Sequence, residues 1–265
     1  MGKALRRVAA AAGFTAAGLY AFYRWQPQRI QVWERPVPED DPQIDPASEF
    51  LFSRDASIAV VTAHPDDAEF YVGGTLTRLH EAGTKITLIV TTDGDKGYYP
   101  GADADANRRI RRQEQLESAS RFGCDEVIFL GHPDGRLRDT RELRAQIRRA
   151  IIASEAQYAM SFDPVFPPRV QHSDHLRTGA ATAHAIRETP NVEFLLQFST
   201  RAPNFAVDIS DVWPAKRELL ALHKSQFSGK KLGFVERMVH GRAAEQGAEA
   251  GVELAESFRV WMRSG

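Results

Sequence analysis

Alternating strand-like and helix-like stretches, beginning near Ser57, constrain the fold of this chain more than any other feature. Short runs rich in valine, isoleucine and threonine are separated by longer stretches with helical periodicity, an order that indicates parallel strands joined by helices. The predicted strands cover residues 57–62, 85–91, 126–130, 158–162, 193–198 and 206–209. The predicted helices cover residues 68–82, 107–122, 140–153 and 175–187, with mostly helical stretches at 213–226 and 234–258. The sequence therefore predicts an α/β, Rossmann-like fold with a mainly parallel sheet and helices on both faces.

Residues 1–26 carry an apolar run, Val8–Tyr23, which is bordered by basic residues at positions 3, 6, 7 and 24. This layout is typical of a signal peptide or of an N-terminal anchor. Because no small-x-small cleavage site follows Tyr20, we expect an uncleaved anchor, with a cleaved signal or a disordered leader as the alternatives. The sequence thus predicts a membrane-anchored protein. Its orientation stays open because basic residues lie on both sides of the run.

Proline and charged residues dominate residues 27–47, which we interpret as a linker. Residues 48–265 hold the predicted strands and helices, and we expect them to form a single catalytic domain.

The 34 basic and 35 acidic residues nearly cancel, so nothing in the composition favours nucleic acid as a partner. A small-molecule or glycoconjugate substrate fits better. The single cysteine, Cys124, cannot form an internal disulfide, and we expect it to be a buried filler.

The first cluster of chemically active residues directly follows the predicted strand at 57–62, where His64 precedes Asp66, Asp67 and Glu69. One acidic residue in a first helical turn needs no role beyond capping, but one imidazole with three carboxylates exceeds what capping requires. Ligands of parallel sheets lie beyond the carboxyl ends of the strands. Imidazole and carboxylate suit a catalytic Zn²⁺, which usually takes three protein ligands and keeps one position for water. The sequence therefore predicts a metal site here.

A second cluster, His172-Ser173-Asp174-His175, follows a proline-rich loop at residues 163–168 and opens another predicted helix. The spacing allows both imidazoles to face one point in a helical turn, although only one of them needs to touch the metal. The alternative is a structural turn with two solvated histidines, which the presence of the first cluster disfavours. We expect the second cluster to supply the third ligand. The remaining histidines lack such acidic company, and we expect them to be structural or surface residues.

Taken together, these motifs resemble the PIG-L/LmbE-like family of zinc-dependent de-N-acetylases over roughly residues 56–226. The motifs that carry the resemblance are Ala63-His64-Pro65-Asp66-Asp67-Ala68-Glu69 with Gly73-Gly74-Thr75, Thr92-Asp93-Gly94-Asp95-Lys96-Gly97, Arg112-Gln113-Glu114 leading to Phe129-Leu130-Gly131 and Pro133-Asp134-Gly135, His172-Ser173-Asp174-His175, and Leu222-His223-Lys224-Ser225-Gln226. Ser173 departs from the family, which commonly has proline there, but the ligand types are unaffected. The resemblance implies a hydrolase that removes the acetyl group from an N-acetylglucosamine-type amino sugar conjugate.

Carried over by position, the resemblance implies three zinc ligands: His64, Asp67 and His175. It implies that Asp66 is the general base that takes a proton from the attacking water. It further implies that His172, oriented by Asp174, stabilises the oxyanion or acts as an acid. Amide hydrolysis needs these parts, because it requires a nucleophile near neutral pH, a positioned base and stabilisation of the developing negative charge.

Three further motif residues, Asp95, Arg112 and Glu114, are weaker candidates for contacts to sugar hydroxyls or for supporting the site, and Arg112 is equally suited to a structural ion pair.

A zinc amidohydrolase or esterase with a non-sugar substrate is an alternative to the sugar deacetylase, because the metal machinery does not specify the acyl acceptor. A catalytically silent, membrane-tethered binding protein is another, which the presence of Asp66 and all the ligands disfavours. A dinucleotide-binding loop is excluded, since no G-x-G-x-x-G follows the first predicted strand.

Overall fold

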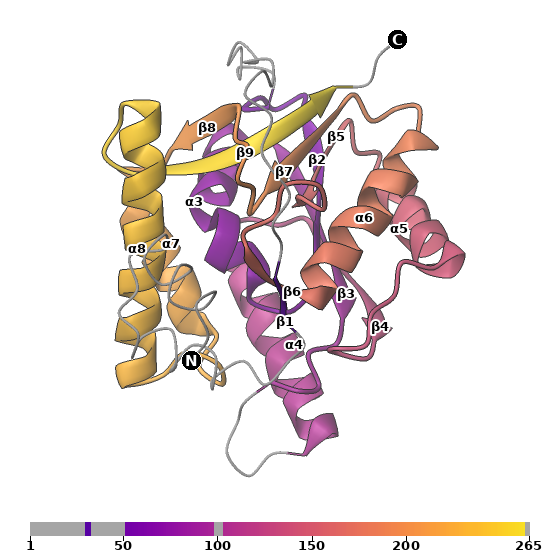
Figure 1. The fold of residues 1–265 in the computed structure, drawn as a ribbon, viewed down its shortest axis with the longest axis horizontal. Helices are drawn as coiled ribbons and strands as arrows, with labels where there is room; N and C mark the ends of the chain where they lie inside the picture. Colours follow the sequence, from indigo (N-terminus) through magenta and orange to yellow (C-terminus); the bar gives the residue numbers. More distant parts are fainter. Residues whose placement is uncertain (1–29, 33–50, 98–102, 263–265) are drawn as a thin grey trace.

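The computed structural model describes residues 30–32, 51–97 and 103–262, and Figure 1 shows helices on both sides of a central sheet. The strands are β1 (Ile30–Val32), β2 (Ser57–Thr62), β3 (Lys85–Thr92), β4 (Glu126–His132), β5 (Tyr158–Phe162), β6 (Val170–His172), β7 (Phe194–Phe198), β8 (Phe205–Asp208) and β9 (Ala255–Met262). The helices of the described residues are α3 (Asp67–Ala82), α4 (Ala104–Arg121), α5 (Arg141–Ala153), α6 (Ser173–Arg187), α7 (Trp213–Leu222) and α8 (Lys230–Ala250). The predicted α/β class is confirmed.

The main sheet has seven strands in the order β4-β3-β2-β5-β7-β9-β8. Its first five strands in that order pair in parallel, whereas β9 is antiparallel to both β7 and β8. The chain moves from β2 outward to β3 and β4, then returns to the other side of β2 with β5. The strand order therefore reverses between β2 and β5, and the crevice beyond their carboxyl ends is the expected ligand position in such a sheet.

The central strand β2 shows how the sequence covers both faces of the sheet. Ile58 and Val60 point into a core cluster that contains residues of α3, α4, α7 and α8, whereas Ala59 and Val61 point into a second cluster with residues of α5 and α6. All four side chains are buried. A strand that is buried on both faces reads as a continuous apolar run because successive residues alternate between the faces.

The helix after β2, α3, is interrupted by a kink at Val72, where the backbone leaves the helical region with φ −136° and ψ 18°. The Gly73-Gly74-Thr75 motif follows the kink directly. A side chain at Gly74 would begin 2.6 Å from Ile209, so this close approach requires glycine. The kink leaves the first turn, which carries Asp67 and Glu69, as a separate short unit at the end of β2.

Three strands, β1, β6 and β9, were not predicted from the sequence. We expected residues 234–258 to be mostly helical, but α8 ends at Ala250, followed by Gly251 with a positive φ of 76°, and Ala255 begins strand β9, which lies between β7 and β8. Strand β6 was not predicted. It pairs antiparallel with β1, so residues 30–32 of the predicted linker form a strand whose Ile30 lies opposite His172. The predicted region boundaries at residues 26 and 47 fall outside the described residues.

The prediction of membrane anchoring is contradicted. Within residues 30–32, 51–97 and 103–262, no helix is both long enough and apolar enough to cross a bilayer. The apolar run on which the prediction rested belongs to residues 1–26, which lie outside the described part of the chain.

Candidate metal centre

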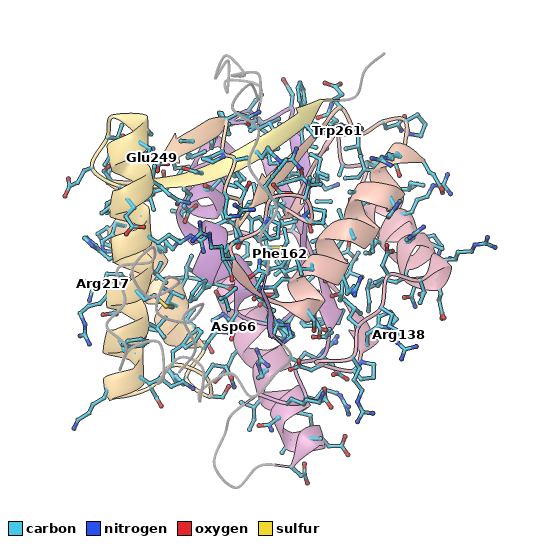
Figure 2. The ribbon with its side chains drawn as sticks, viewed as in Figure 1. Asp66, Arg138, Phe162, Arg217, Glu249 and Trp261 are labelled. Carbon is cyan, nitrogen blue, oxygen red and sulfur yellow. The ribbon has the colours of Figure 1, made fainter. Side chains whose placement is uncertain are left out.

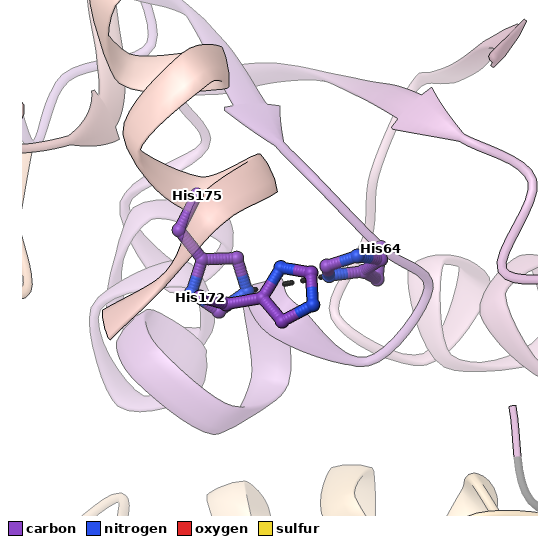
Figure 3. A group of neighbouring side chains, drawn as sticks. All are labelled: His64, His172 and His175. Atoms are coloured by element: carbon purple, nitrogen blue, oxygen red, sulfur yellow. Dashed lines mark hydrogen bonds between the residues drawn. The ribbon is translucent and has the colours of Figure 1, made fainter. Parts of the chain in front are cut away.

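Two loops at the carboxyl edge of the sheet bring the two predicted clusters together. His64 follows β2 and Asp67 begins α3, while His172 ends β6 and His175 lies in the first turn of α6. The rings of His64, His172 and His175 converge (Figure 3), and one nitrogen from each lies within 4.8 Å of the others. All three histidines are buried. Segments more than a hundred residues apart in sequence thus form one polar site.

The three predicted ligands, His64, Asp67 and His175, have the mutual spacing that one metal ion requires. We call these three residues, together with the neighbouring His172, the ligand cluster. His64 Nδ1 lies 3.2 Å from His175 Nε2, His175 Nε2 lies 3.1 Å from Asp67 Oδ1, and Asp67 Oδ2 lies 3.4 Å from His64 Nδ1. Tetrahedral ligands at about 2.0–2.1 Å from zinc are separated by about 3.3 Å. The donor set therefore fits a small cation such as Zn²⁺.

The outer partners of the two imidazoles fix where their lone pairs point. His64 Nε2 faces the carboxylate oxygens of Asp134 at 3.2 Å and Asp174 at 3.5 Å, so this nitrogen carries a hydrogen. His175 Nδ1 faces Gln171 Oε1 at 3.4 Å and likewise acts as the donor. The remaining nitrogens, His64 Nδ1 and His175 Nε2, then direct lone pairs at each other. Only a positive charge between them stabilises this arrangement, and partners of this kind commonly orient zinc-binding histidines.

The electrostatics of His64 agree with a site built for positive charge. Burial alone would lower the pKa of this imidazole, but the carboxylates of Asp134, Asp174 and Asp67 raise it well above its usual range. For Asp67, burial alone would raise the pKa, and His175 and His64 instead hold it well below its usual range. Both shifts show that the surroundings of these two side chains favour positive charge on the imidazole and negative charge on the carboxylate.

The adjacent residues Asp66 and Asp67 point in different directions because their backbones differ. Asp67 Oδ2 accepts hydrogen bonds from the backbone N–H groups of Ala63 at 3.1 Å and His64 at 2.7 Å. The Asp67 carboxylate therefore faces the rings of His64 and His175. Asp66 is the N-cap of α3 and has a φ of 104°, a left-handed conformation that costs a non-glycine residue about 1–3 kcal/mol. Such strain is concentrated at functional sites. Asp66 is thus turned away from the ligand position of its neighbour.

Arg111 of α4 holds the Asp66 loop from the other side. Its guanidinium donates to the carbonyl of Pro65 at 2.6 Å, to Asp66 Oδ2 at 3.1 Å and to the carbonyl of Gly94 at 3.0 Å. Burial raises the pKa of Asp66 to about 6, although Arg111 opposes this increase. The Asp66 side chain retains 14% exposure, so a substrate or water molecule can reach it. A carboxylate with a pKa near the working pH suits a general base.

His172 presents an unused hydrogen-bonding group to the site. Its Nδ1 accepts the backbone N–H of Asp174 at 3.1 Å, so its Nε2 carries the hydrogen. That Nε2 is buried and has no hydrogen-bond partner among the described residues. Burial and the neighbouring rings of His64 and His175 lower the pKa of His172 to about 3, which keeps it neutral. The ring is therefore a neutral donor whose partner is absent from the described chain.

Asp174 orients His172 through its backbone, whereas its carboxylate serves another purpose. Asp174 Oδ2 accepts the N–H of Gly135 at 2.6 Å and Oδ1 accepts that of Leu137 at 3.2 Å, and Oδ2 also faces His64. Asp174 therefore contacts His172 through its backbone N–H. The carboxylate ties the 133–137 loop to the candidate ligand His64.

The structure places the three weaker candidates outside direct contact with the ligand cluster. Arg112 is exposed on α4 with its guanidinium 4.0 Å from the centre of the Phe129 ring, because the buried face of α4 carries Arg111 instead. Glu114 accepts the backbone N–H of Ser225 at 2.7 Å and its hydroxyl at 2.6 Å. Asp95 Oδ1 accepts the backbone N–H of Asp134 at 2.9 Å. Glu114 and Asp95 thus support loops around the site.

Sequence reasoning did not assign roles to Arg111, Gln115 or Asp134, although each takes part in the site. The signal for the first two was a spacing of four residues along α4, where Asn107, Arg111, Gln115 and Ser118 form a buried polar stripe. Asp134 lay within a quoted motif. His223 was expected to be structural or at the surface, and it is buried with Nε2 3.1 Å from Glu69 Oε2.

Three aromatic rings, those of Tyr71, Phe162 and Phe198, pack around the candidate ligand His175. The Phe162 ring, near the centre of Figure 2, stacks on the His175 ring with 4.1 Å between centroids and an angle of 9° between planes. Tyr71 packs edge-on against His175 at 5.6 Å and stacks on Phe198 at 5.5 Å. This packing fixes the ring orientation, and it lowers the solvent access that would weaken charge interactions in the site.

Comparisons with known proteins identify relatives of this chain. It is 26% identical to the diacetylchitobiose deacetylase of Thermococcus kodakarensis over 76% of this chain and 82% of that protein. It is 25% identical to a probable N-acetyl-alpha-D-glucosaminyl L-malate deacetylase 2 of Bacillus anthracis over 77% and 94% of the two chains. The solved N,N'-diacetylchitobiose deacetylase of Pyrococcus horikoshii matches with a TM-score of 0.74 and 26% identity, over 79% of this chain and 85% of that one.

The pattern of the PIG-L family, described as GlcNAc-PI de-N-acetylase, matches residues 59–186. This stretch runs from β2 to α6 and contains both sequence clusters, at residues 64–69 and 172–175. The resemblance drawn from the motifs is therefore confirmed, and residues 59–186 belong to the PIG-L family of deacetylases.

Proposed function

We propose that this protein is a zinc-dependent N-deacetylase that removes the acetyl group from an N-acetylglucosamine-type amino sugar conjugate. The observation that carries the proposal is the convergence of His64 Nδ1, His175 Nε2 and Asp67 at 3.1–3.4 Å beside the strained Asp66. The similarity to deacetylases with N-acetylglucosamine-type substrates supports the reaction class.

Three residues hold the metal in this proposal: His64, Asp67 and His175. A bound zinc ion supplies a Lewis acid that lowers the pKa of water to about 7 and polarises the acetyl carbonyl. The His64 orientation comes from Asp134 and Asp174, and the His175 orientation comes from Gln171 and the Phe162 ring. Orienting partners of this kind typically contribute about 10- to 100-fold in metal affinity or activity.

The neighbouring side chains handle protons and charge. Asp66 accepts a proton from the water that attacks the acetyl carbon and delivers it to the leaving amine, while Arg111 limits how far burial raises its pKa. His172 Nε2–H donates to the oxygen of the acetyl group as negative charge develops there. Because His172 is neutral, this role is hydrogen-bond donation and not proton transfer. Donors aimed at a developing oxyanion typically contribute about 10²–10³ in rate.

The proposal is tested by metal analysis combined with a substrate panel. The purified chain is assayed for released acetate with N,N'-diacetylchitobiose, N-acetylglucosaminyl malate, N-acetylglucosaminyl inositol and, as a non-sugar amide, N-acetyl-lysine. We expect about one zinc per chain, loss of activity on chelation, and recovery on adding zinc back. Activity on N-acetyl-lysine alone would favour the non-sugar amidohydrolase. A folded, metal-free chain with full sugar deacetylation would contradict the mechanism.

A further inference from the structure

Helix α4 contacts Asp66 with two side chains from one face. Arg111 and Gln115 are four residues apart and therefore lie above one another on the helix. Arg111 binds the Asp66 carboxylate, and Gln115 Oε1 accepts the Asp66 backbone N–H at 2.9 Å. Both α4 side chains are buried, Gln115 completely. The carboxylate and the backbone of one residue are thus held by neighbouring turns of the same helix.

The amide of Gln115 has only one orientation that satisfies its surroundings. Its Nε2 donates to Glu69 Oε1 at 2.7 Å, and a carboxylate can only accept. The oxygen of the amide must then face Asp66 N–H, which can only donate. A reversed amide would place two donors against each other at Asp66 and two acceptors against each other at Glu69. The negative charge of Glu69 therefore sets the direction of the hydrogen bond that reaches Asp66.

His223 completes this chain of contacts at its far end. Its Nε2 lies 3.1 Å from Glu69 Oε2, and both residues are buried, with 1% and 0% exposure of their side chains. A buried carboxylate without a cationic or donor partner is costly. His223 thus faces Glu69 Oε2 and leaves Oε1 to accept from Gln115, although His223 directly follows α7 and is far from the candidate metal ligands in sequence.

We propose that Gln115 is a positioning residue for Asp66, and that Glu69 and His223 fix the polarity of its amide. The hydrogen bond from Asp66 N–H to Gln115 stabilises the left-handed backbone of Asp66, which directs its side chain away from that of Asp67. Losing it allows Asp66 to relax toward a more common backbone conformation. The inference rests on the proposed function, since it assumes that Asp66 is the general base.

The first test is the substitution Gln115→Met, which keeps the length of the side chain but removes the acceptor for Asp66 N–H. We expect kcat for N,N'-diacetylchitobiose to fall about 10- to 100-fold, because small misplacements of catalytic groups have effects of this size. We expect KM and the zinc content to stay close to wild type. The matched control is Gln197→Met, which removes another buried amide on β7 that contacts Arg259. This control should keep full activity.

A double-mutant cycle with Asp66→Asn separates positioning from general damage. If Gln115 acts through Asp66, Gln115→Met in the Asp66→Asn background causes little or no further loss of rate. An equal additional loss in that background, or wild-type kcat in Gln115→Met, would overturn the inference. Full activity of Asp66→Asn itself would instead overturn the proposed function, so the two failures are distinguishable.

Glu69→Gln provides a second variant should Gln115→Met fail to fold. The neutral amide at position 69 no longer fixes the orientation of Gln115, and it can donate to the Gln115 oxygen. We expect a lower kcat with retained zinc, and again no further loss in the Asp66→Asn background. Loss of zinc with unchanged kcat per bound zinc would contradict the proposed polarity.

Discussion

Two buried charge clusters contact the same helix, α3, on either side of its kink at Val72. Beyond the kink, Glu256 accepts four hydrogen bonds, from the N–H groups of Gly74 and Thr75, the Thr75 hydroxyl and the Lys216 ammonium. Before the kink, the cluster around Asp67 leaves the His172 Nε2 donor without a partner among the described residues, and it directs two imidazole lone pairs at one point.

The difference distinguishes a structural cluster from a functional one. Glu256 and Lys216 are both 2% exposed and mutually neutralised, so this pair caps the second part of α3 and has little left to bind. The ligand cluster instead has hydrogen-bonding capacity that the chain itself does not use. Buried polar groups are normally satisfied, and unused capacity in such a cluster suits the binding of a cation and a polar ligand.

The largest expected effect comes from breaking the ligand cluster with His175→Ala. Two remaining protein ligands hold zinc much more weakly, so we expect the metal content to fall from about one per chain to a small fraction and activity to be lost. Elemental analysis and the acetate-release assay measure both quantities. Normal activity at normal zinc content would remove His175 from the site.

Breaking the Glu256–Lys216 pair should lower the stability of the fold without changing the metal content. Lys216→Met leaves the Glu256 carboxylate buried without its cation, which typically costs about 3–5 kcal/mol. We expect urea denaturation to show this loss in the free energy of unfolding. Zinc per folded chain should stay at the wild-type level. A loss of zinc at unchanged stability would reverse the contrast between the clusters.

A more moderate effect is expected for Asp134→Asn, which weakens the partner of His64 Nε2 without removing a ligand. Orienting carboxylates typically contribute about 10- to 100-fold in metal affinity or activity. Zinc titration against a competing chelator measures the affinity. Asp139→Asn is a suitable control, because Asp139 pairs with Arg144 of α5 and does not contact the ligand cluster. Equal zinc affinity in the two variants would contradict the role of Asp134.

The smallest expected effect is a pH dependence of stability from the Glu69–His223 pair. Burial alone would lower the pKa of His223, but Glu69 raises it above its usual range. A raised folded-state pKa gives stability that is present below the unfolded value of about 6.5 and is lost as the pH rises through the folded value. The Tm difference between wild type and His223→Asn should therefore be larger at about pH 6 than at about pH 9. A difference independent of pH would show that His223 is neutral in the folded protein.

Local sequence patterns predicted much of the fold because strands buried on both faces are continuous apolar runs. Strands β2 and β5 begin and end where the sequence indicated. Strand β9 was missed because the buried Glu256 and the partly buried Arg259 form ion pairs with distant partners, and such pairing has no local signature. The end of α8 was marked only by Gly251, which has the positive φ typical of a helix end.

The candidate site was predictable where its residues immediately follow strands, and it was not where tertiary contacts decide. His64 and Asp67 follow β2 and mark the carboxyl edge of the main sheet, whereas His175 was recognised from the His172-Ser173-Asp174-His175 cluster at the start of a predicted helix. The choice of Arg111 over Arg112 depends on the rotation of α4 about its axis, which a motif does not contain. The ligand roles remain a prediction that the geometry supports.

The most direct test of the account compares Asp66→Asn with Asp67→Asn in zinc content and in deacetylation rate, after both variants are shown to be folded. Asp66→Asn should retain zinc and lose about 10²–10⁴ in rate, because an amide cannot accept the proton from the attacking water. Asp67→Asn should weaken zinc binding, because a neutral amide replaces an anionic ligand. Zinc loss in Asp66→Asn with retention in Asp67→Asn would reverse the two roles. Retained zinc and near-normal rates in both would show that this cluster is not the catalytic site.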